Sequence, residues 1–74
     1  MNFDSLNTKQ IEYFKNKVLP LKIKELQELK EVAEEGFYDL SEVNTYINRY
    51  KELHSKKDIK GLYSLFNEID SKFV

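Results

Sequence analysis

The chain has 74 residues, a formal net charge of −1, 41% apolar residues, 14% aromatic residues, no cysteine and one histidine. The lack of cysteine excludes disulfide staples and thiolate metal sites, and the near-zero net charge gives no general attraction to nucleic acid or anionic lipid. A domain of this size buries only about 60% of its unfolded surface, so helix packing or oligomerisation must supply its stability.

No apolar run approaches the length of a membrane span, and residues Met1–Asp4 lack the basic and apolar regions of a signal peptide. The sequence therefore predicts a soluble, cytoplasmic protein without a membrane partner. Lysine far outnumbers arginine, and asparagine, isoleucine and tyrosine are frequent, which indicates an AT-rich bacterial or phage genome.

The first predicted helix covers residues 8–19. Asn7 suits the N-cap position and Gln10 stands at N3, so the pair predicts a capping box. The apolar residues that follow recur at helical spacing and predict the buried face: Ile11, Phe14, Val18 and Leu21, with Tyr13 on the flank.

Pro20 interrupts this stripe, because proline lacks a backbone donor and disfavours helix at the residue before it. We interpret Pro20 as the first residue of a second helix over 20–35, and a kinked continuous helix is the alternative. Gly36 at C′ and Phe37 at C″, opposite Val32 at C3, predict that a Schellman motif ends this helix.

Asp39 predicts the N-cap of a third helix over 40–54, with Glu42 at N3. A helix stop and a helix start separated by so few residues predict a tight αα-hairpin, because helices joined this briefly are antiparallel neighbours.

A fourth helix is predicted over 59–72, after Asp58 as its cap. Gly61 in its first turn either permits a close helix approach or marks fraying. The apolar stripe of this helix is the clearest in the chain and comprises Ile59, Leu62, Phe66, Ile69 and Phe73. Together the elements predict an all-α fold, a single domain over residues 1–74 that forms a small three- to four-helix bundle on the antiparallel αα-hairpin.

His54 is the only side chain suited to acid–base work near neutral pH. No serine, cysteine or acidic residue stands at a spacing that indicates a nucleophile or a relay, so we interpret His54 as a surface histidine near the end of its helix. We expect no catalytic residue, cofactor or metal site, and hence no enzyme.

Charge is segregated along the chain. Residues 1–24 and 43–60 each carry a net charge of +3, whereas residues 25–42 carry −6. The cluster Glu31, Glu34, Glu35 and Asp39 matches no calcium loop and is interpreted as a solvated acidic face. The segregation indicates either attraction between neighbouring helices or a polar interface with a charged protein partner.

The third helix also carries side chains that read base edges in nucleic-acid complexes, which makes DNA or RNA binding through residues 40–54 the alternative function. Acidic residues around Gly36 weigh against it, because they repel phosphate. The residues that this alternative requires are Asn44, Thr45, Tyr46, Asn48, Arg49 and Lys51, with Lys56, Lys57 and Lys60 for phosphates.

Ten phenylalanine and tyrosine residues exceed what a minimal core needs, so they either fill a loosely shaped core or form a protein interface. Our leading hypothesis is a non-enzymatic interaction module, a small bacterial or phage regulator, inhibitor or adaptor. It would act through an aromatic helical face, with a homodimer through the fourth helix as its most specific version. The predicted contact residues are Tyr63, Phe66, Ile69 and Phe73, followed by Tyr46 and Tyr50.

Overall fold

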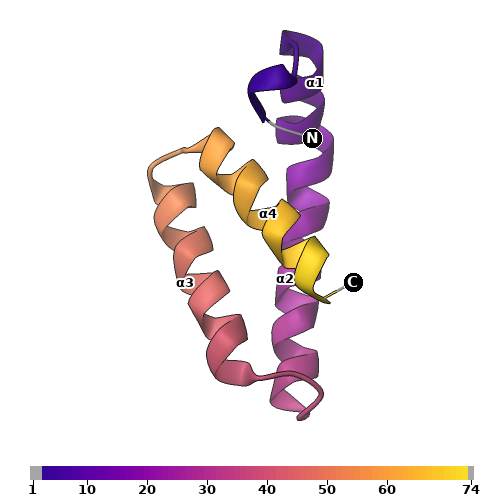
Figure 1. Ribbon diagram of the computed structural model, residues 1–74, viewed down its shortest axis with the longest axis vertical. Helices are drawn as coiled ribbons and strands as arrows, with labels where there is room; N and C mark the ends of the chain where they lie inside the picture. The colour runs from indigo at the N-terminus through magenta and orange to yellow at the C-terminus, as the bar shows by residue number, and fades with distance from the viewer. Residues whose placement is uncertain (1–2, 74) are drawn as a thin grey trace.

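A computed structural model describes residues 3–73, and within that range the chain is all-helical, with its helices packed together and no strand. A short 3-10 turn, η1 (Phe3–Ser5), precedes α1 (Thr8–Tyr13), the π-helical turn η2 (Phe14–Val18) and α2 (Leu19–Glu34). They are followed by α3 (Leu40–Ser55) and α4 (Ile59–Phe73). In Figure 1, α2 descends, the chain turns back into α3, and α4 crosses in front of α2.

The elements α1, η2 and α2 follow one another without a break and form one rod, which we call the long helix (Figure 1). The interpretation that Pro20 opens a separate helix is therefore wrong, and the continuous alternative is observed. Val18 and Leu19 both have right-handed helical backbone angles, and the amide of Leu19 donates to the carbonyl of Phe14, five residues back. The wider π turn makes room for the proline ring, which would otherwise crowd the carbonyl four residues before it.

The π turn also changes which side chains face the core. It adds one residue to a turn, so the step from one buried side chain to the next is five residues, from Phe14 to Leu19. Leu19 is buried, and Leu21, which the sequence places on the apolar stripe, is 63% exposed. The prediction for Leu21 is wrong because it assumed a uniform period of 3.6 residues.

The predicted caps of the long helix are confirmed. The side chain of Asn7 accepts from the amide of Gln10, and the Gln10 side chain accepts from the amide of Asn7, both at 2.9 Å. At the other end, Gly36 has φ of +97°, its amide donates to Ala33, and the amide of Phe37 donates to Val32. These two bonds form the Schellman motif.

The turn between α3 and α4 repeats the same motif without glycine. Lys57 takes a left-handed conformation, with φ of +55°, and the amide of Asp58 donates to the carbonyl of Leu53. Asp58 then caps α4 as predicted, because its side chain accepts from the amide of Gly61 at 2.9 Å. A β-carbon at Gly61 would lie 2.6 Å from that carboxylate and 2.7 Å from a methyl of Leu53. The close approach of Asp58 and Leu53 to position 61 therefore explains why a glycine stands there.

The core lies where α4 packs against the long helix and α3. α4 supplies half of its buried side chains, three of them from the predicted apolar stripe, and Leu65, beside that stripe, is fully buried. Its buried members are Phe14, Leu19 and Leu26 from the long helix, Tyr46 from α3, and Leu62, Leu65, Phe66 and Ile69 from α4. At one end, the ring of Tyr63 packs edge-on against Phe3 and Phe14.

Ion pairs join α4 to each neighbouring element. Asp70 pairs with Lys22 of α2, and Glu68 pairs with Arg49 of α3. Lys72 pairs with Glu42 of α3, and Lys60 with Asp4 of η1. Opposite charges on neighbouring helices therefore attract each other, mainly through α4. From the acidic segment 25–42, Glu42 is the residue that takes part in these ion pairs between elements.

Candidate functional site

An apolar groove of about 310 Å³ lies between α2 and α4 and is the candidate binding site of the chain. Buried side chains form its floor, and half-buried ones of both helices form its walls together with Tyr38 from the connection. The residues that line it are Leu26, Leu29, Val32, Tyr38, Phe66, Ile69 and Phe73, with Lys22, Glu25, Glu28 and Asp70 at its rim. Such a groove accepts an apolar side chain from a partner helix.

The upper rim of this groove is fixed by the ion pair between Lys22 and Asp70. The Nζ atom of Lys22 lies 2.6 Å from a carboxylate oxygen of Asp70 and 3.4 Å from Glu25. The hydrogen bond to Asp70 raises the pKa of Lys22 above its ordinary 10.5, because it favours the charged ammonium. The rim is therefore held in place by charge as well as by packing.

The rest of α2 presents carboxylates without cations. Within residues 3–73 no ion pair reaches Glu28, Glu31, Glu34 or Glu35. The last three stand near the C-terminal end of the helix, where the helix dipole disfavours negative charge. The surface beside the groove is acidic and would gain from a basic partner.

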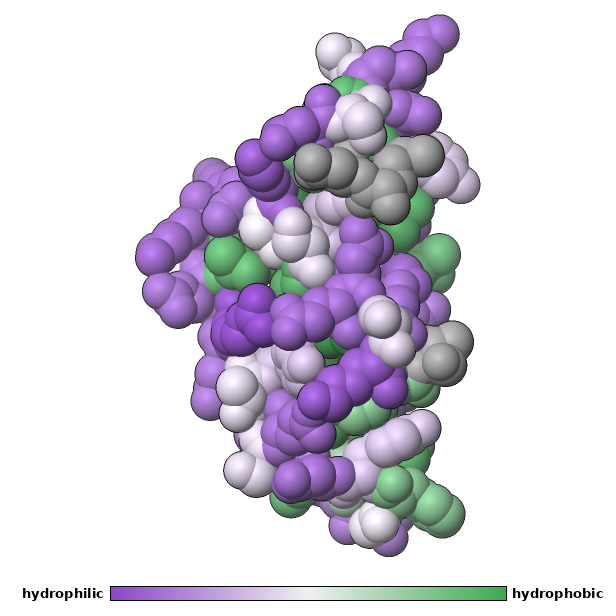
Figure 2. Space-filling view, in the orientation of Figure 1, coloured by the Kyte–Doolittle hydropathy of each residue, from purple (hydrophilic) through white to green (hydrophobic). Residues whose placement is uncertain are grey.

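Large apolar side chains are exposed at the end of the molecule beside the groove. They belong to the connection between α2 and α3 and to the first turn of α3: Phe37 is 73% exposed, Tyr38 41% and Leu40 37%. In the space-filling view (Figure 2), green atoms gather near this lower end. The ring of Tyr38 packs edge-on against Phe73, so the exposed group continues into the groove.

The six predicted contact residues fall into two groups. Phe66, Ile69 and Tyr46 are buried in the core, with between 3% and 7% of each exposed, although the first two also line the groove. Phe73, Tyr50 and Tyr63 are half-buried. The structure brings Phe66, Ile69 and Phe73 together at the groove, and Tyr50 lines a smaller hollow between α2 and α3. Their role as contact residues stays a prediction.

Leu29, Val32 and Tyr38 line the groove but were not among the predicted contact residues. Val32 was assigned only to the predicted helix end, Leu29 lies within the predicted second helix, and Tyr38 lies in the connection between α2 and α3. No local pattern marks them, because the groove exists only where α2 and α4 meet.

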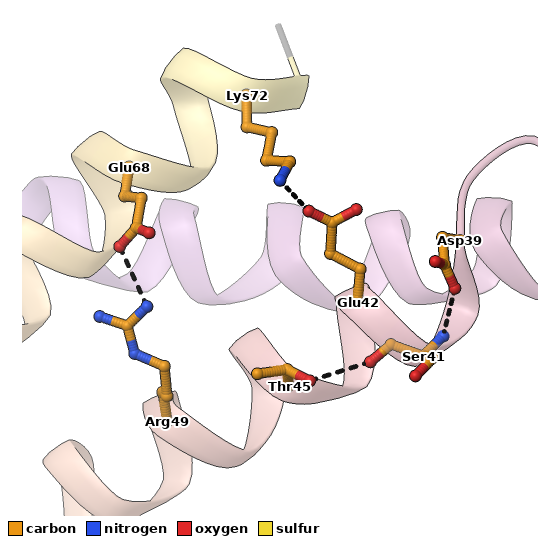
Figure 3. A network of polar contacts seen from close by, with 7 residues as sticks. All are labelled: Asp39, Ser41, Glu42, Thr45, Arg49, Glu68 and Lys72. Carbon is orange, nitrogen blue, oxygen red and sulfur yellow. Dashed lines mark hydrogen bonds and ion pairs between the residues drawn. The ribbon is translucent and has the colours of Figure 1, made fainter.

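Two of the polar residues of α3 that nucleic-acid binding would need, Arg49 and Thr45, are engaged within the chain (Figure 3). Arg49 binds Glu68 at 3.0 Å and stacks over the ring of Tyr46, and the hydroxyl of Thr45 donates to the carbonyl of Ser41. The Asp39 side chain accepts from the amide of Ser41, which confirms Asp39 as the cap, whereas Glu42 at N3 pairs with Lys72. Asn44, Asn48 and Lys51 are exposed. Binding of DNA or RNA through α3 stays a prediction.

His54 is exposed in the last turn of α3, with its ring against that of Tyr50 at 5.4 Å between centroids. It borders a hollow of about 370 Å³ together with Lys15 and Lys57. The predicted absence of catalysis stays a prediction.

Within residues 3–73, no helix is long and apolar enough to cross a lipid bilayer. The same part of the chain holds no group of three or more histidine, aspartate or glutamate side chains placed to bind a metal ion. No family model matches the chain, and neither a curated protein nor a solved structure was found to match it.

Proposed function

We propose that the chain is a small non-enzymatic interaction module, a regulator, inhibitor or adaptor of bacterial or phage origin, which acts in the cytoplasm by binding protein. Its bundle is built on an antiparallel αα-hairpin of α2 and α3, with α4 packed across. The groove between α2 and α4 takes an apolar side chain of the partner, and Phe66, Ile69 and Phe73 form the α4 side of the contact.

The main support for this proposal is that the groove continues into the exposed apolar side chains at the connection between α2 and α3. Phe37, Tyr38 and Leu40 are more than a third exposed, and Tyr38 links them to Phe73 in the groove. Burying apolar surface is favourable by about 25 cal/mol per Å², so a partner that covers this region stabilises the complex. Apolar side chains gathered on one surface are typical of protein-binding sites.

Site-specific photo-crosslinking in the host cell tests the proposal. A photoreactive benzoylphenylalanine replaces Tyr38 at the groove, and in a matched control it replaces Asn44, which is exposed on α3. We expect a discrete protein adduct from position 38 and none from position 44 after irradiation. Equal adducts from both positions, or none from position 38, would contradict the proposal.

A further inference from the structure

We propose that the groove is occupied by Tyr13 of a second copy of this chain, in a symmetric dimer whose two long helices lie antiparallel. This inference rests on the proposed function and names the partner of the same groove. It gives the dimer a different surface from the fourth helix, whose stripe is largely consumed by the core.

The outer face of the long helix carries the two large apolar side chains that the core leaves out. Tyr13 is 64% exposed and Leu21 63% exposed. Because the π turn lies between them, they are about two full turns apart and share one face. Lys17 stands between them on the same face and is exposed. A basic stripe with an aromatic anchor results.

The other half of the same face is acidic. Glu28 and Glu35 continue the stripe beyond Leu21 at helical spacing, and Glu28 also borders the groove. Within the described chain neither Lys17 nor Glu28 takes part in an ion pair. This face is thus basic in its first half and acidic in its second. Each half holds a charged side chain, Lys17 or Glu28, that can pair with a partner.

Two copies of such a face are complementary when they lie antiparallel, because the basic half of each then contacts the acidic half of the other. In a twofold dimer, residue i of one copy contacts residue j of the other, and j contacts i. Leu21 is the midpoint of the long helix, residues 8–34, so an antiparallel pair centred there places Leu21 against its own counterpart. The same register places Tyr13 beside Leu29 and Val32 of the second copy, which line the groove. It also places Lys17 opposite Glu25, which already pairs with Lys22, and within about one helical turn of Glu28, which a lysine side chain can reach.

A charge swap tests this arrangement by sedimentation equilibrium at low salt. Lys17→Glu alone and Glu28→Lys alone should each weaken dimerisation about tenfold, because each reversal occurs twice in the dimer. The double variant Lys17→Glu with Glu28→Lys should restore it. A parent that stays monomeric at submillimolar concentration would overturn the inference, as would a double variant weaker than both singles. Both sites are exposed, and if either variant loses its helical circular dichroism, Lys9→Glu with Glu35→Lys repeats the swap further out.

A cysteine at the twofold axis provides an independent readout, since the chain has no other cysteine. Mild oxidation should convert Leu21→Cys into a covalent dimer within the time that leaves the control Asn44→Cys monomeric, because a disulfide needs Cα atoms closer than about 7 Å. Equal rates for the two variants would overturn the proposed register. A monomeric parent whose position 38 still crosslinks to another protein would remove the dimer and leave the proposed function intact.

Discussion

The ammonium group of Lys22 lies 2.6 Å from a carboxylate oxygen of Asp70, and this ion pair joins the middle of the long helix to the second half of α4. The pair lies at the rim of the groove. It fixes the distance between α2 and α4, and the groove stays open only if that distance is kept. The pair therefore links the stability of the bundle to the shape of the candidate site.

The Lys22–Asp70 pair predicts a pH dependence of stability. The pKa of Lys22 is raised in the folded state, so the stabilisation is complete below the unfolded value of 10.5 and is lost as the pH rises through the folded value. Asp70→Asn should lower the free energy of unfolding by about 1 kcal/mol at neutral pH. Urea titrations of parent and variant should show this difference intact at about pH 8 and smaller at about pH 11. A constant difference would contradict the assignment.

Gly61 predicts an unusual response to alanine. In an exposed helix, glycine to alanine stabilises by about 1 kcal/mol, but a β-carbon here meets the Asp58 cap and Leu53. Gly61→Ala should therefore lower the melting temperature, by an amount that corresponds to about 1 kcal/mol. The control Ser64→Ala, at an exposed position of the same helix, should raise it slightly. A Gly61→Ala variant as stable as the parent would show that α4 is free to move away from the turn.

Lys57 holds a left-handed conformation that costs about 1 kcal/mol for a residue with a β-carbon. Lys57→Gly should therefore increase the free energy of unfolding by up to about 1 kcal/mol, reduced by the greater freedom of glycine in the unfolded chain. Lys51→Gly, in the middle of α3, should decrease it by a similar amount. Chemical denaturation of the two variants measures both signs, and destabilisation by Lys57→Gly would contradict the Schellman geometry.

Leu65 is fully buried between the helices, so shortening it leaves a cavity. Leu65→Ala should cost about 3 kcal/mol of unfolding free energy, a large part of what a domain of this size has. Phe37→Ala, which removes a larger but mostly exposed side chain, should change the free energy by less than about 0.5 kcal/mol. Thermal unfolding followed by circular dichroism distinguishes the two, and similar losses from both would place the core elsewhere.

The helix ends could be predicted because their signals are local. Asn7 with Gln10, Gly36 with Phe37, and Asp58 each act within a few residues, and the structure forms the bond that each predicts. The observed helices end within one residue of the predicted bounds at residues 35, 54 and 72.

Features that depend on tertiary context could not be predicted in the same way. A proline predicts that a helix is interrupted near it. Whether the helix ends or instead forms a wider π turn depends on whether the core requires the helix to continue past Pro20. Nothing in the sequence predicts that Lys57 adopts a left-handed conformation. That conformation is required only because α4 begins directly after α3. The groove, with its contributions from Leu29, Tyr38 and Phe73, appears only once α2 and α4 are packed.

Self-association through the outer face of the long helix is tested most directly by the concentration dependence of the backbone amide chemical shifts of the parent protein. Upon dilution, the self-association proposed here predicts shifts that change along the outer face, at Tyr13, Lys17, Leu21 and Glu28, and around the groove, while amides of α3 opposite it stay constant. Shifts that do not depend on concentration, or that change along α3 and leave the outer face of the long helix constant, would contradict it.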